Sequence, residues 1–407
     1  MNRKHYWMRE DAPMQPKSQL ELNTQSFELL KRTLRLNVEA QRLRKGTEAS
    51  LPQVLGIKLT NRCNLRCNHC YQWNESGYHQ DMEREEQMLD LDISVFKRIL
   101  NETRAVKSRL YLWGGEPLFH RNIAEILDLL AEDPRETIIC TNAHYLEKHL
   151  PALCKISENL ELLIAVEGFE SQHDSLRGKG SFNKVMSQID ELMRLRKEGI
   201  FKGKISIHSV INDGMINRLY ELMEFFESKG IDLVLLCFPW YISEETSHEM
   251  NAFVTEKFGW LIEAPTGAKR HTWDAFKYRI SPLNINSLVA DLKRINERVW
   301  KTRIRYQPGL DFDEVEAFVR GQTMTARCAT KCSVLTTRVD IMPTGKVSAC
   351  KFFSEFVVGN LHNESLQEMW NSEAYEGIRQ VFDQGLSPAC SKCNVLYLQE
   401  HSIPVNI

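Results

Sequence analysis

The alternation of short apolar runs with amphipathic stretches constrains the fold of this chain more than any other feature. Two of the amphipathic stretches run directly to a glycine, Gly199 and Gly230, where a helix commonly ends. The apolar runs are rich in branched residues and short enough to be buried strands. There are six of them between residues 54 and 240: VLGIKLT, RLYLWGG, TIICTNA, LELLIAVEG, KISIHSVIN and LVLLCFPW. Six strand-and-helix repeats predict a parallel sheet with right-handed crossovers.

Six repeats are too few to close an eight-stranded barrel, so we expect an α/β fold with an open, partial (β/α)6 TIM-like barrel. In parallel α/β folds the chemistry sits at the carboxyl ends of the strands, and the residues that follow the six runs are therefore the first candidates for a site. Residues 241–325 are mixed and include a helical pattern over 287–299, which predicts a helical insertion after the sixth strand. The segment VDIMPTGKVSAC (339–350) predicts a hairpin.

Composition argues against several classes of function. The 407 residues carry a formal net charge of −2, which does not favour a broad nucleic-acid or anionic-membrane surface. No uncharged apolar run reaches the roughly 18 residues of a membrane span, and the N-terminus lacks the apolar core of a signal peptide. We therefore expect a cytoplasmic protein with no nucleic-acid and no membrane partner. Residues 1–50 are polar and predict an N-terminal helical extension.

The eleven cysteines are concentrated at two places in the chain. Three of them scatter through the middle, and the other eight are Cys63, Cys67 and Cys70 after the first strand and Cys328, Cys332, Cys350, Cys390 and Cys393 in the last fifth. In a cytosolic protein such clusters are metal ligands or reactive thiols more often than disulfides. Three thiolates on one loop can hold three corners of a [4Fe–4S] cubane and leave one iron open, because full ligation takes four. A zinc site completed by His69 or His79 is an alternative.

The spacing Cys63-x3-Cys67-x2-Cys70 after a strand resembles the signature of the radical S-adenosylmethionine (radical SAM) superfamily. The resemblance implies that the open iron binds SAM and that an electron from the reduced cluster cleaves it. It also implies that the resulting 5′-deoxyadenosyl radical removes a hydrogen atom from the substrate. His69 stands where the family usually places an aromatic residue beside the adenine. A reductase such as flavodoxin or ferredoxin is the implied electron donor.

The ends of the second and third strands carry further motifs of this kind. Gly114, Gly115, Glu116 and Pro117 resemble the GGEP motif of the family, whose backbone and glutamate side bind the methionine amino group. The two glycines would let the backbone approach a ligand closely. Asn142 lies in a segment that resembles the family's Thr-Asn-Gly and is expected to face the cofactor.

The later strands are followed by weaker matches. Glu167 ends the fourth run in a segment similar to Ser-x-Asp-Gly, with Ala165 and Glu167 as departures. Arg177, in a matching loop, could pair bidentately with a carboxylate, although a surface charge at a helix end is the ordinary interpretation. Ser209 on the fifth strand is a further expected cofactor contact. Cys237 ends the sixth strand and could donate a hydrogen atom to a substrate radical if it points into the barrel; otherwise it is a core cysteine.

The C-terminal cysteines resemble a second feature of the superfamily. Cys332, Cys350 and Cys390-x2-Cys393 match the twitch form of the SPASM domain, in which four cysteines hold an auxiliary [4Fe–4S] cluster. Cys328 could replace Cys332 as the first ligand. A structural zinc ribbon built from four of these five thiols is an alternative.

The resemblance predicts a radical SAM enzyme in three parts. These are an N-terminal helical extension (1–50), a partial barrel with a helical insertion (51–325) and a twitch/SPASM-like auxiliary-cluster domain (326–407). SAM and two [4Fe–4S] clusters are the expected cofactors. Relatives with such C-terminal domains often cross-link, epimerise or oxidise residues of ribosomally made peptides or proteins, and we expect a function of this kind. Alternatives are oxidation of a small molecule such as a sugar or cyclitol, and a non-enzymatic, zinc-stabilised binding protein.

Overall fold

One twisted sheet organises the part of the chain that the computed structural model describes, namely residues 11–15, 51–266, 269–322, 332, 334–393 and 396. Within these residues the sheet has ten strands in the order β10-β9-β8-β1-β2-β3-β4-β5-β6-β7. The first seven strands lie parallel to their neighbours: β1 Val54–Thr60, β2 Arg109–Gly114, β3 Thr137–Thr141, β4 Leu160–Ala165, β5 Lys204–Val210, β6 Leu233–Cys237 and β7 Arg303–Gln307. The predicted α/β partial barrel is confirmed, and β7 extends it beyond the six expected strands.

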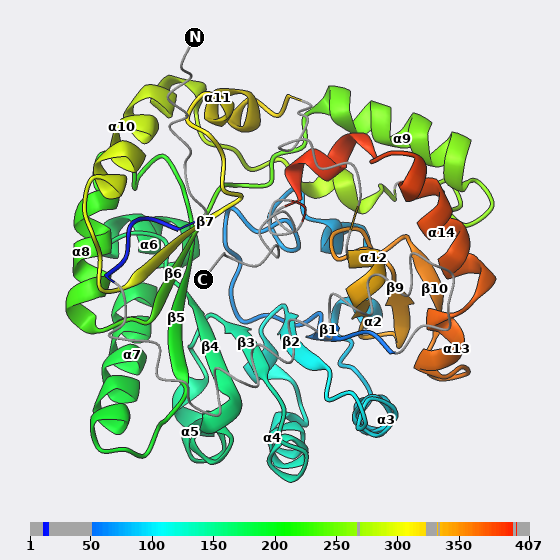
Figure 1. Ribbon diagram of the computed structural model, residues 1–407, viewed down its shortest axis with the longest axis horizontal. Helices are drawn as coiled ribbons and strands as arrows, with labels where there is room; N and C mark the ends of the chain where they lie inside the picture. Colours follow the sequence, from blue (N-terminus) through cyan, green and yellow to red (C-terminus); the bar gives the residue numbers. More distant parts are fainter. Residues whose placement is uncertain are drawn as a thin grey trace.

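Helices cover the outer side of the curved sheet (Figure 1). Their apolar stripes face the strands, as amphipathic periodicity requires. The helices between the parallel strands are α3 Ile93–Glu102, α4 Ile123–Glu132, α5 Leu146–Lys155, α6 Glu170–Arg177, α7 Ser181–Lys197 and α8 Leu219–Lys229. Helix α8 ends at Gly230 in the left-handed conformation, as predicted. Helix α6 was not predicted, because its eight residues carry almost no apolar stripe.

Shorter elements connect or extend this framework. Before and within the barrel they are η1 Tyr78–Asp81, α2 Arg84–Gln87, η2 Pro117–Phe119 and η3 Ser157–Asn159. The predicted insertion between β6 and β7 contains α9 Glu244–Phe258, η4 Thr272–Ala275, η5 Pro282–Asn284 and α10 Ile285–Asn296, and α11 Glu314–Val319 follows β7.

The C-terminal region joins the same sheet. Its elements are α12 Val334–Thr337, β8 Arg338–Ile341, β9 Lys346–Ser348, β10 Val357–Asn360, α13 Leu366–Trp370, α14 Glu373–Gln384 and η7 Pro388–Lys392. Strands β8 and β9 form the predicted antiparallel hairpin, and β8 also pairs in parallel with β1. Gly56 makes this second pairing possible, because a Cβ atom there would lie 1.9 Å from Oδ1 of Asp340. The sheet therefore runs continuously across the predicted boundary at residue 326.

The opposite edge of the sheet is covered by residues 11–15. The backbone N–H of Ala12 donates to the carbonyl of Ile304 on β7 at 2.8 Å. Asp11 forms ion pairs with Arg303 and Arg305 on the same strand. A covered edge is protected from pairing with another chain. The remainder of the predicted 1–50 extension and Cys328 lie outside the described residues.

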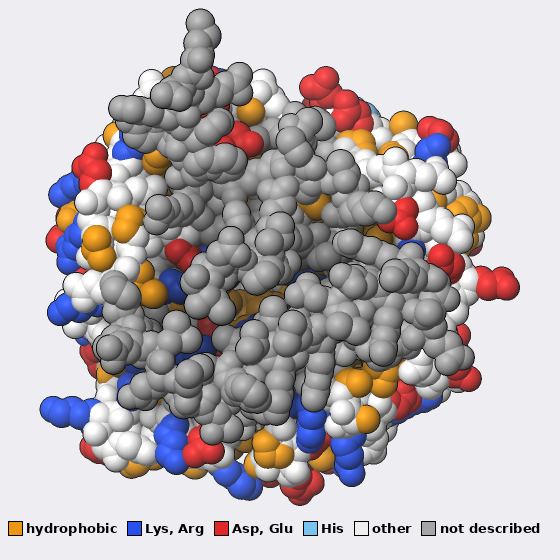
Figure 2. Space-filling view, viewed as in Figure 1, with side chains coloured by type: hydrophobic (Ala, Val, Ile, Leu, Met, Phe, Trp, Pro, Cys, Tyr) orange, Lys and Arg blue, Asp and Glu red, His pale blue; other side chains and the backbone are white. Residues whose placement is uncertain are grey.

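The surface is mixed in charge. Figure 2 shows Lys and Arg side chains interspersed with Asp and Glu around the rim of the visible face. This agrees with the net charge of −2. Among the described residues, no helix combines the length and apolarity that a bilayer crossing requires.

Candidate active site

A cavity of about 200 Å³ lies at the carboxyl ends of the barrel strands, where parallel α/β folds place their chemistry. It brings together most of the residues singled out in the sequence. The lining includes Cys63, Cys67, His69, Cys70, Gly114, Gly115, Glu116, Asn142, Arg177 and Cys237. Pro117, Glu167 and Ser209 are not among the lining residues. These residues come from five separate segments of the chain, which therefore converge on one site.

The three cysteines of the first set line the cavity from the loop after β1. The Cys70 N–H donates to the carbonyl of Cys67 at 3.1 Å, which closes a tight turn between them. Burial raises the pKa of the Cys63 thiol to about 12 and that of Cys67 to about 11. Both groups are therefore neutral thiols unless a bound cation stabilises the thiolate, and soft thiolates suit iron–sulfur clusters. In the described part of the chain, no three His, Cys, Asp or Glu side chains converge on a single-ion site.

The glycine turn after β2 packs against the start of this cysteine loop. A Cβ atom on Gly114 would lie 2.5 Å from the carbonyl oxygen of Thr60, and one on Gly115 would lie 2.2 Å from that of Arg62. The N–H groups of Gly115 and Glu116 donate to these same two carbonyls at 2.8 and 2.9 Å. The close approach that we expected toward a ligand is thus made to the backbone of the cysteine loop. The two glycines set the distance between the loop and the sheet.

The Glu116 carboxylate ties the ends of β2 and β3 together. It accepts hydrogen bonds from the Thr141 hydroxyl (2.7 Å), the Asn142 N–H (2.7 Å) and the Leu118 N–H (3.0 Å). Burial nevertheless raises its pKa. The Asn142 side chain donates in turn to Oδ1 of Asn64 in the cysteine loop at 2.9 Å. These contacts hold the cysteine loop and two strand ends in a fixed relation, and the contact of Glu116 with a methionine amino group stays a prediction.

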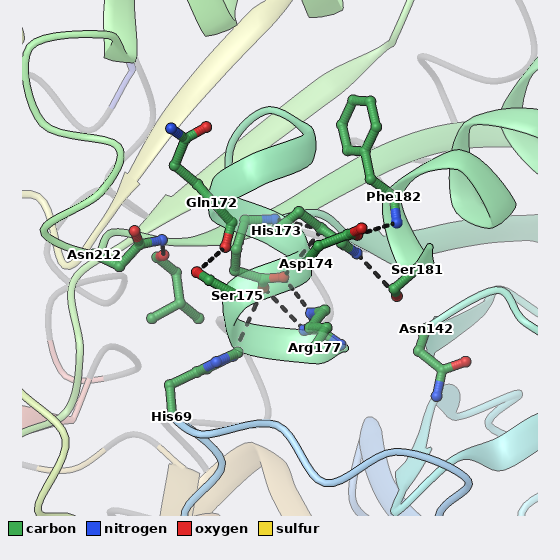
Figure 3. Close-up of polar contacts among 12 residues, drawn as sticks. His69, Asn142, Gln172, His173, Asp174, Ser175, Arg177, Ser181, Phe182 and Asn212 are labelled. Atoms are coloured by element: carbon green, nitrogen blue, oxygen red, sulfur yellow. Dashed lines mark hydrogen bonds and ion pairs between the residues drawn. The ribbon is translucent and has the colours of Figure 1, made fainter. Parts of the chain in front are cut away.

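Arg177, which Figure 3 shows at the end of α6, pairs with Glu167 inside the protein. Its Nη2 donates to Oε1 of Glu167 at 2.9 Å, and its Nε donates to the other oxygen. The Glu167 side chain is fully buried and that of Arg177 is 10% exposed. Burial acts to raise the pKa of Glu167, but the guanidinium outweighs it and lowers that pKa to about 2. The ordinary interpretation of Arg177 as a surface charge is wrong, because the end of α6 turns it inward.

Hydrogen bonds of His173, which Figure 3 shows beside Ser181, support this pair. The Glu167 N–H donates to Nδ1 of His173 at 3.1 Å, so that nitrogen carries no proton. Nε2 of His173 therefore donates to the Ser181 hydroxyl at 3.1 Å, and the same hydroxyl forms a hydrogen bond with Nε2 of His144 at 3.0 Å. His69 approaches Glu167 from the cavity side, with 3.8 Å between Nε2 and Oε1. Burial lowers the pKa values of His69 and His173 to about 4, so both are neutral at pH 7.

Ser209 does not line the cavity, and its predicted contact with a cofactor stays a prediction. Side chains alternate along β5, and His208 and Val210 line the cavity. Ser209 is fully buried on the opposite face, where its hydroxyl has no hydrogen-bond partner. The same alternation could have identified His208 from the sequence, since Ile205 and Ile207 mark the face toward the helices. Pro117 begins the η2 turn and is buried outside the cavity.

Cys237 does point to the cavity and is 1% exposed. Its Sγ lies 3.3 Å from Nε2 of His208 and 3.4 Å from Oε1 of Gln307 on β7. Burial raises the pKa of the thiol, so it retains its proton. The hydrogen-donor role of Cys237 stays a prediction.

The C-terminal thiols gather in a second place. Burial raises the pKa of Cys332 to about 12, and the nearby thiols of Cys390 and Cys393 add to that effect. Burial also raises the pKa of Cys350, and the same two thiols again contribute. The Ser387 hydroxyl lies 3.1 Å from the sulfur of Cys390. The four predicted auxiliary ligands are thus close enough to influence one another, and their ligation of a cluster stays a prediction.

Family comparisons agree with this geometry. The family model described as the radical SAM superfamily matches residues 57–224, which contain most of β1, the cysteine loop and strands β2–β5. The model described as an iron–sulfur cluster-binding domain, SPASM, matches residues 332–394. The chain belongs to the radical SAM superfamily and carries a SPASM domain. SAM and [4Fe–4S] clusters are typical of radical SAM enzymes with this domain.

Individual relatives of this radical SAM protein are distant. GTP 3′,8-cyclase of Aquifex aeolicus is 27% identical over 184 residues, 44% of this chain, which spans about half (55%) of that enzyme. The serine-type anaerobic sulfatase-maturating enzyme of Bacteroides thetaiotaomicron is 23% identical over 365 residues, covering 84% of this chain and 80% of the enzyme. The structure of Streptococcus suis SuiB bound to the precursor peptide SuiA aligns with 88% of this chain and 72% of its own length. Its TM-score is 0.55 at 18% identity, which shows a common fold.

Proposed function

We propose that this radical SAM enzyme modifies a residue of a ribosomally made peptide or protein by cross-linking, epimerisation or oxidation. The observation that carries the proposal is the single cavity that the three loop cysteines share with the Gly114–Glu116 turn, Asn142 and Arg177. Closure of an active site excludes water from reactive intermediates. A sulfur-lined cavity at the strand ends suits radical chemistry.

We assign the first cysteine set to the cluster that binds SAM, and Cys332, Cys350, Cys390 and Cys393 to one auxiliary cluster. The donor chemistry fits, because buried neutral thiols become thiolates on binding a soft metal centre. When bound, the first cluster and SAM supply a radical that removes a hydrogen atom from the substrate. A flavodoxin or ferredoxin is the proposed source of electrons.

The other residues of the site take positioning or contact roles in this proposal. His69, Gly114, Gly115, Glu116, Asn142 and Arg177 line the cavity and are the proposed SAM contacts. Glu167 orients Arg177 through two hydrogen bonds and so acts through it. Pro117 fixes the turn that follows Glu116.

The relatives support a peptide or protein substrate over a small molecule. The sulfatase-maturating enzyme, which by its name acts on a protein, aligns over 84% of this chain. SuiB, whose structure holds a precursor peptide, aligns over 88%. Coverage alone does not separate the substrate classes, because Fe-coproporphyrin III synthase of Methanosarcina barkeri, which by its name makes a small molecule, aligns over 83%. The peptide hypothesis is favoured because two of the similar solved structures, SuiB and anSMEcpe, hold peptides.

Anaerobic reconstitution and an assay of SAM cleavage test the proposal. We expect on the order of eight irons per chain, from two cubanes, and formation of 5′-deoxyadenosine after chemical reduction. Replacing Cys63, Cys67 or Cys70 by Ala should abolish that product. Cys154→Ser is the matched control, because Cys154 lies on helix α5 and does not line the cavity. Cleavage that survives in the loop variants would show that the ligand assignment is wrong.

The substrate class needs a separate experiment. Coexpression with a short peptide encoded beside the gene should change the mass of that peptide, and Cys67→Ala should prevent the change. A peptide that stays unmodified while a sugar or cyclitol is oxidised would favour the small-molecule alternative.

A further inference from the structure

The charged side chains that line the cavity already have partners among the described residues. Glu116 accepts three hydrogen bonds from strand ends, and Arg177 pairs with Glu167. Burial lowers the pKa of the lining histidine His208 to about 4, so it is uncharged at pH 7. His69 faces the Arg177–Glu167 pair, with 3.8 Å between its Nε2 and Oε1 of Glu167. Glu116 and Arg177 are also proposed SAM contacts, so with SAM bound neither is left as a counter-ion for a charged substrate group.

One part of the wall is aromatic. Tyr71 from the cysteine loop stacks on Phe276 from the insertion, with ring centroids 4.7 Å apart. Trp240, just after β6, lies 5.8 Å from Tyr71 and 6.4 Å from Phe276. All three side chains line the cavity. We call these three residues the aromatic subsite. It is built from three separate segments of the chain, so it depends on the tertiary fold.

A side chain of the SPASM domain packs against the aromatic subsite. Phe352, two residues after Cys350, meets Trp240 edge to face with 4.5 Å between centroids. It also lies 5.9 Å from Phe276. The adjacent Phe353 is buried against Trp273, at 5.5 Å, which anchors this segment in the insertion. The position of Trp240 is thus coupled to the C-terminal domain.

The geometry points to an uncharged substrate group, and we propose that the aromatic subsite receives an apolar or aromatic side chain of the peptide. This inference rests on the proposed function in taking a peptide as the substrate. Burial of apolar and aromatic groups against aromatic rings is favourable, whereas an unpaired ion loses its hydration there.

A cationic side chain is the main competitor, because aromatic faces attract cations. Here the ammonium of Lys351 already lies 5.7 Å from the Trp240 ring and 5.7 Å from that of Phe352. A second cation beside the same rings would be repelled by it. Lys351 is not a lining residue of the cavity, so it does not offer its charge directly to an acidic group there.

Titration calorimetry with four small probes tests the inference on the reconstituted holoenzyme in the presence of SAM and without reductant. The probes are the N-acetyl amides of phenylalanine, leucine, aspartate and lysine. We expect the first two to bind at least tenfold more tightly than the last two. Trp240→Ala should weaken the phenylalanine probe at least tenfold, and Trp240→Phe should retain most of the affinity. Trp260→Ala is the control, because Trp260 is 55% exposed and lies outside the cavity.

The outcomes separate this inference from the proposed function. Equal binding of the aspartate or lysine probe, or no binding of any probe, would overturn the aromatic subsite. Unchanged affinity in Trp240→Ala would overturn it as well. SAM cleavage is measured in a different assay, and its failure would count against the proposed function whatever the probes do. Phe352→Ala should lower the affinity for the phenylalanine probe about threefold while SAM cleavage persists. This result would show that Phe352 of the SPASM domain helps to position Trp240.

Discussion

At the residue scale, the buried pair of Arg177 and Glu167 contributes to stability near the site. Arg177→Met leaves the fully buried Glu167 carboxylate without its partner, which typically costs about 3–5 kcal/mol. We expect a clear fall in the thermal midpoint. Adding Glu167→Gln should restore much of it, because the unpaired charge is then removed.

The control for this prediction is Arg194→Met. Arg194 pairs with Glu191 and Glu198 on the exposed face of α7 and is 53% exposed. Exposed pairs contribute at most about 1 kcal/mol. Equal losses in the Arg177 and Arg194 variants would contradict the view that burial decides the difference.

The histidines give the protein a pH dependence of stability in a defined window. The pKa values of His173 and His208 are about 4 in the folded chain, below the usual 6.5. The unfolded chain therefore binds more protons between these values, and stability is greatest above pH 6.5 and falls toward pH 4. Each histidine contributes up to about 1.4 kcal/mol per pH unit.

Thermal midpoints measured between pH 7.5 and 5.5 test this expectation. His173→Gln can still accept from the Glu167 N–H and donate to Ser181, but it does not titrate. Its midpoint should fall less steeply with decreasing pH than that of the native chain. Parallel curves for the two proteins would show that His173 does not contribute.

Motif positions predicted which residues gather at the site, but could not predict how they pair. The cysteine loop, Gly114–Glu116 and Asn142 are adjacent to strand ends in the sequence, and the topology brings strand ends together. The pairing of Arg177 with Glu167 could not be predicted from motif positions. It depends on α6 bringing a side chain ten residues further along the chain back to Glu167. Tyr71, Trp240 and Phe276 carry no motif, because their relation exists only after three segments have folded together.

At the element scale, the packing of the glycine turn against the cysteine loop decides whether the loop can keep its position. Gly115→Ala would place a Cβ atom 2.2 Å from the Arg62 carbonyl, so backbone must move. Overpacking of this kind costs about 1–3 kcal/mol. We expect a lower thermal midpoint together with loss of iron from the first cluster. Gly385→Ala is the control, because a Cβ atom there meets nothing within 4 Å and the backbone is extended.

The periodicity of apolar residues predicts the local elements of the fold but not their long-range pairing. The strands β1–β6 and their long helices follow from apolar runs and amphipathic stretches. The hairpin of β8 and β9 follows from a local turn at Gly345. The pairing of β8 with β1 joins residues almost 300 positions apart in the chain, and the only local trace of it is Gly56. Long-range pairing of this kind is set by the assembled sheet.

At the scale of the whole molecule, one continuous sheet makes the barrel and the SPASM domain interdependent. Strand β1 is buried on both sides between β2 and β8, and removal of residues 326–407 would leave it at an open edge. An unprotected edge with Leu55, Ile57 and Leu59 promotes pairing between chains. We expect the truncated chain to aggregate in size-exclusion chromatography. A stable monomer with the native thermal midpoint would contradict this.

Gly56→Ala tests the pairing of β1 with β8 in the full-length chain, where the SPASM domain is still present. Its Cβ atom would overlap the Asp340 carboxylate, which Arg338 holds in place with two hydrogen bonds. Because this carboxylate is fully buried and paired, it cannot move aside without breaking those bonds. The variant should therefore separate β8 from β1, lower the thermal midpoint and weaken the phenylalanine probe through Phe352. Loss of stability with probe affinity unchanged would mean that the aromatic subsite is held by the barrel alone.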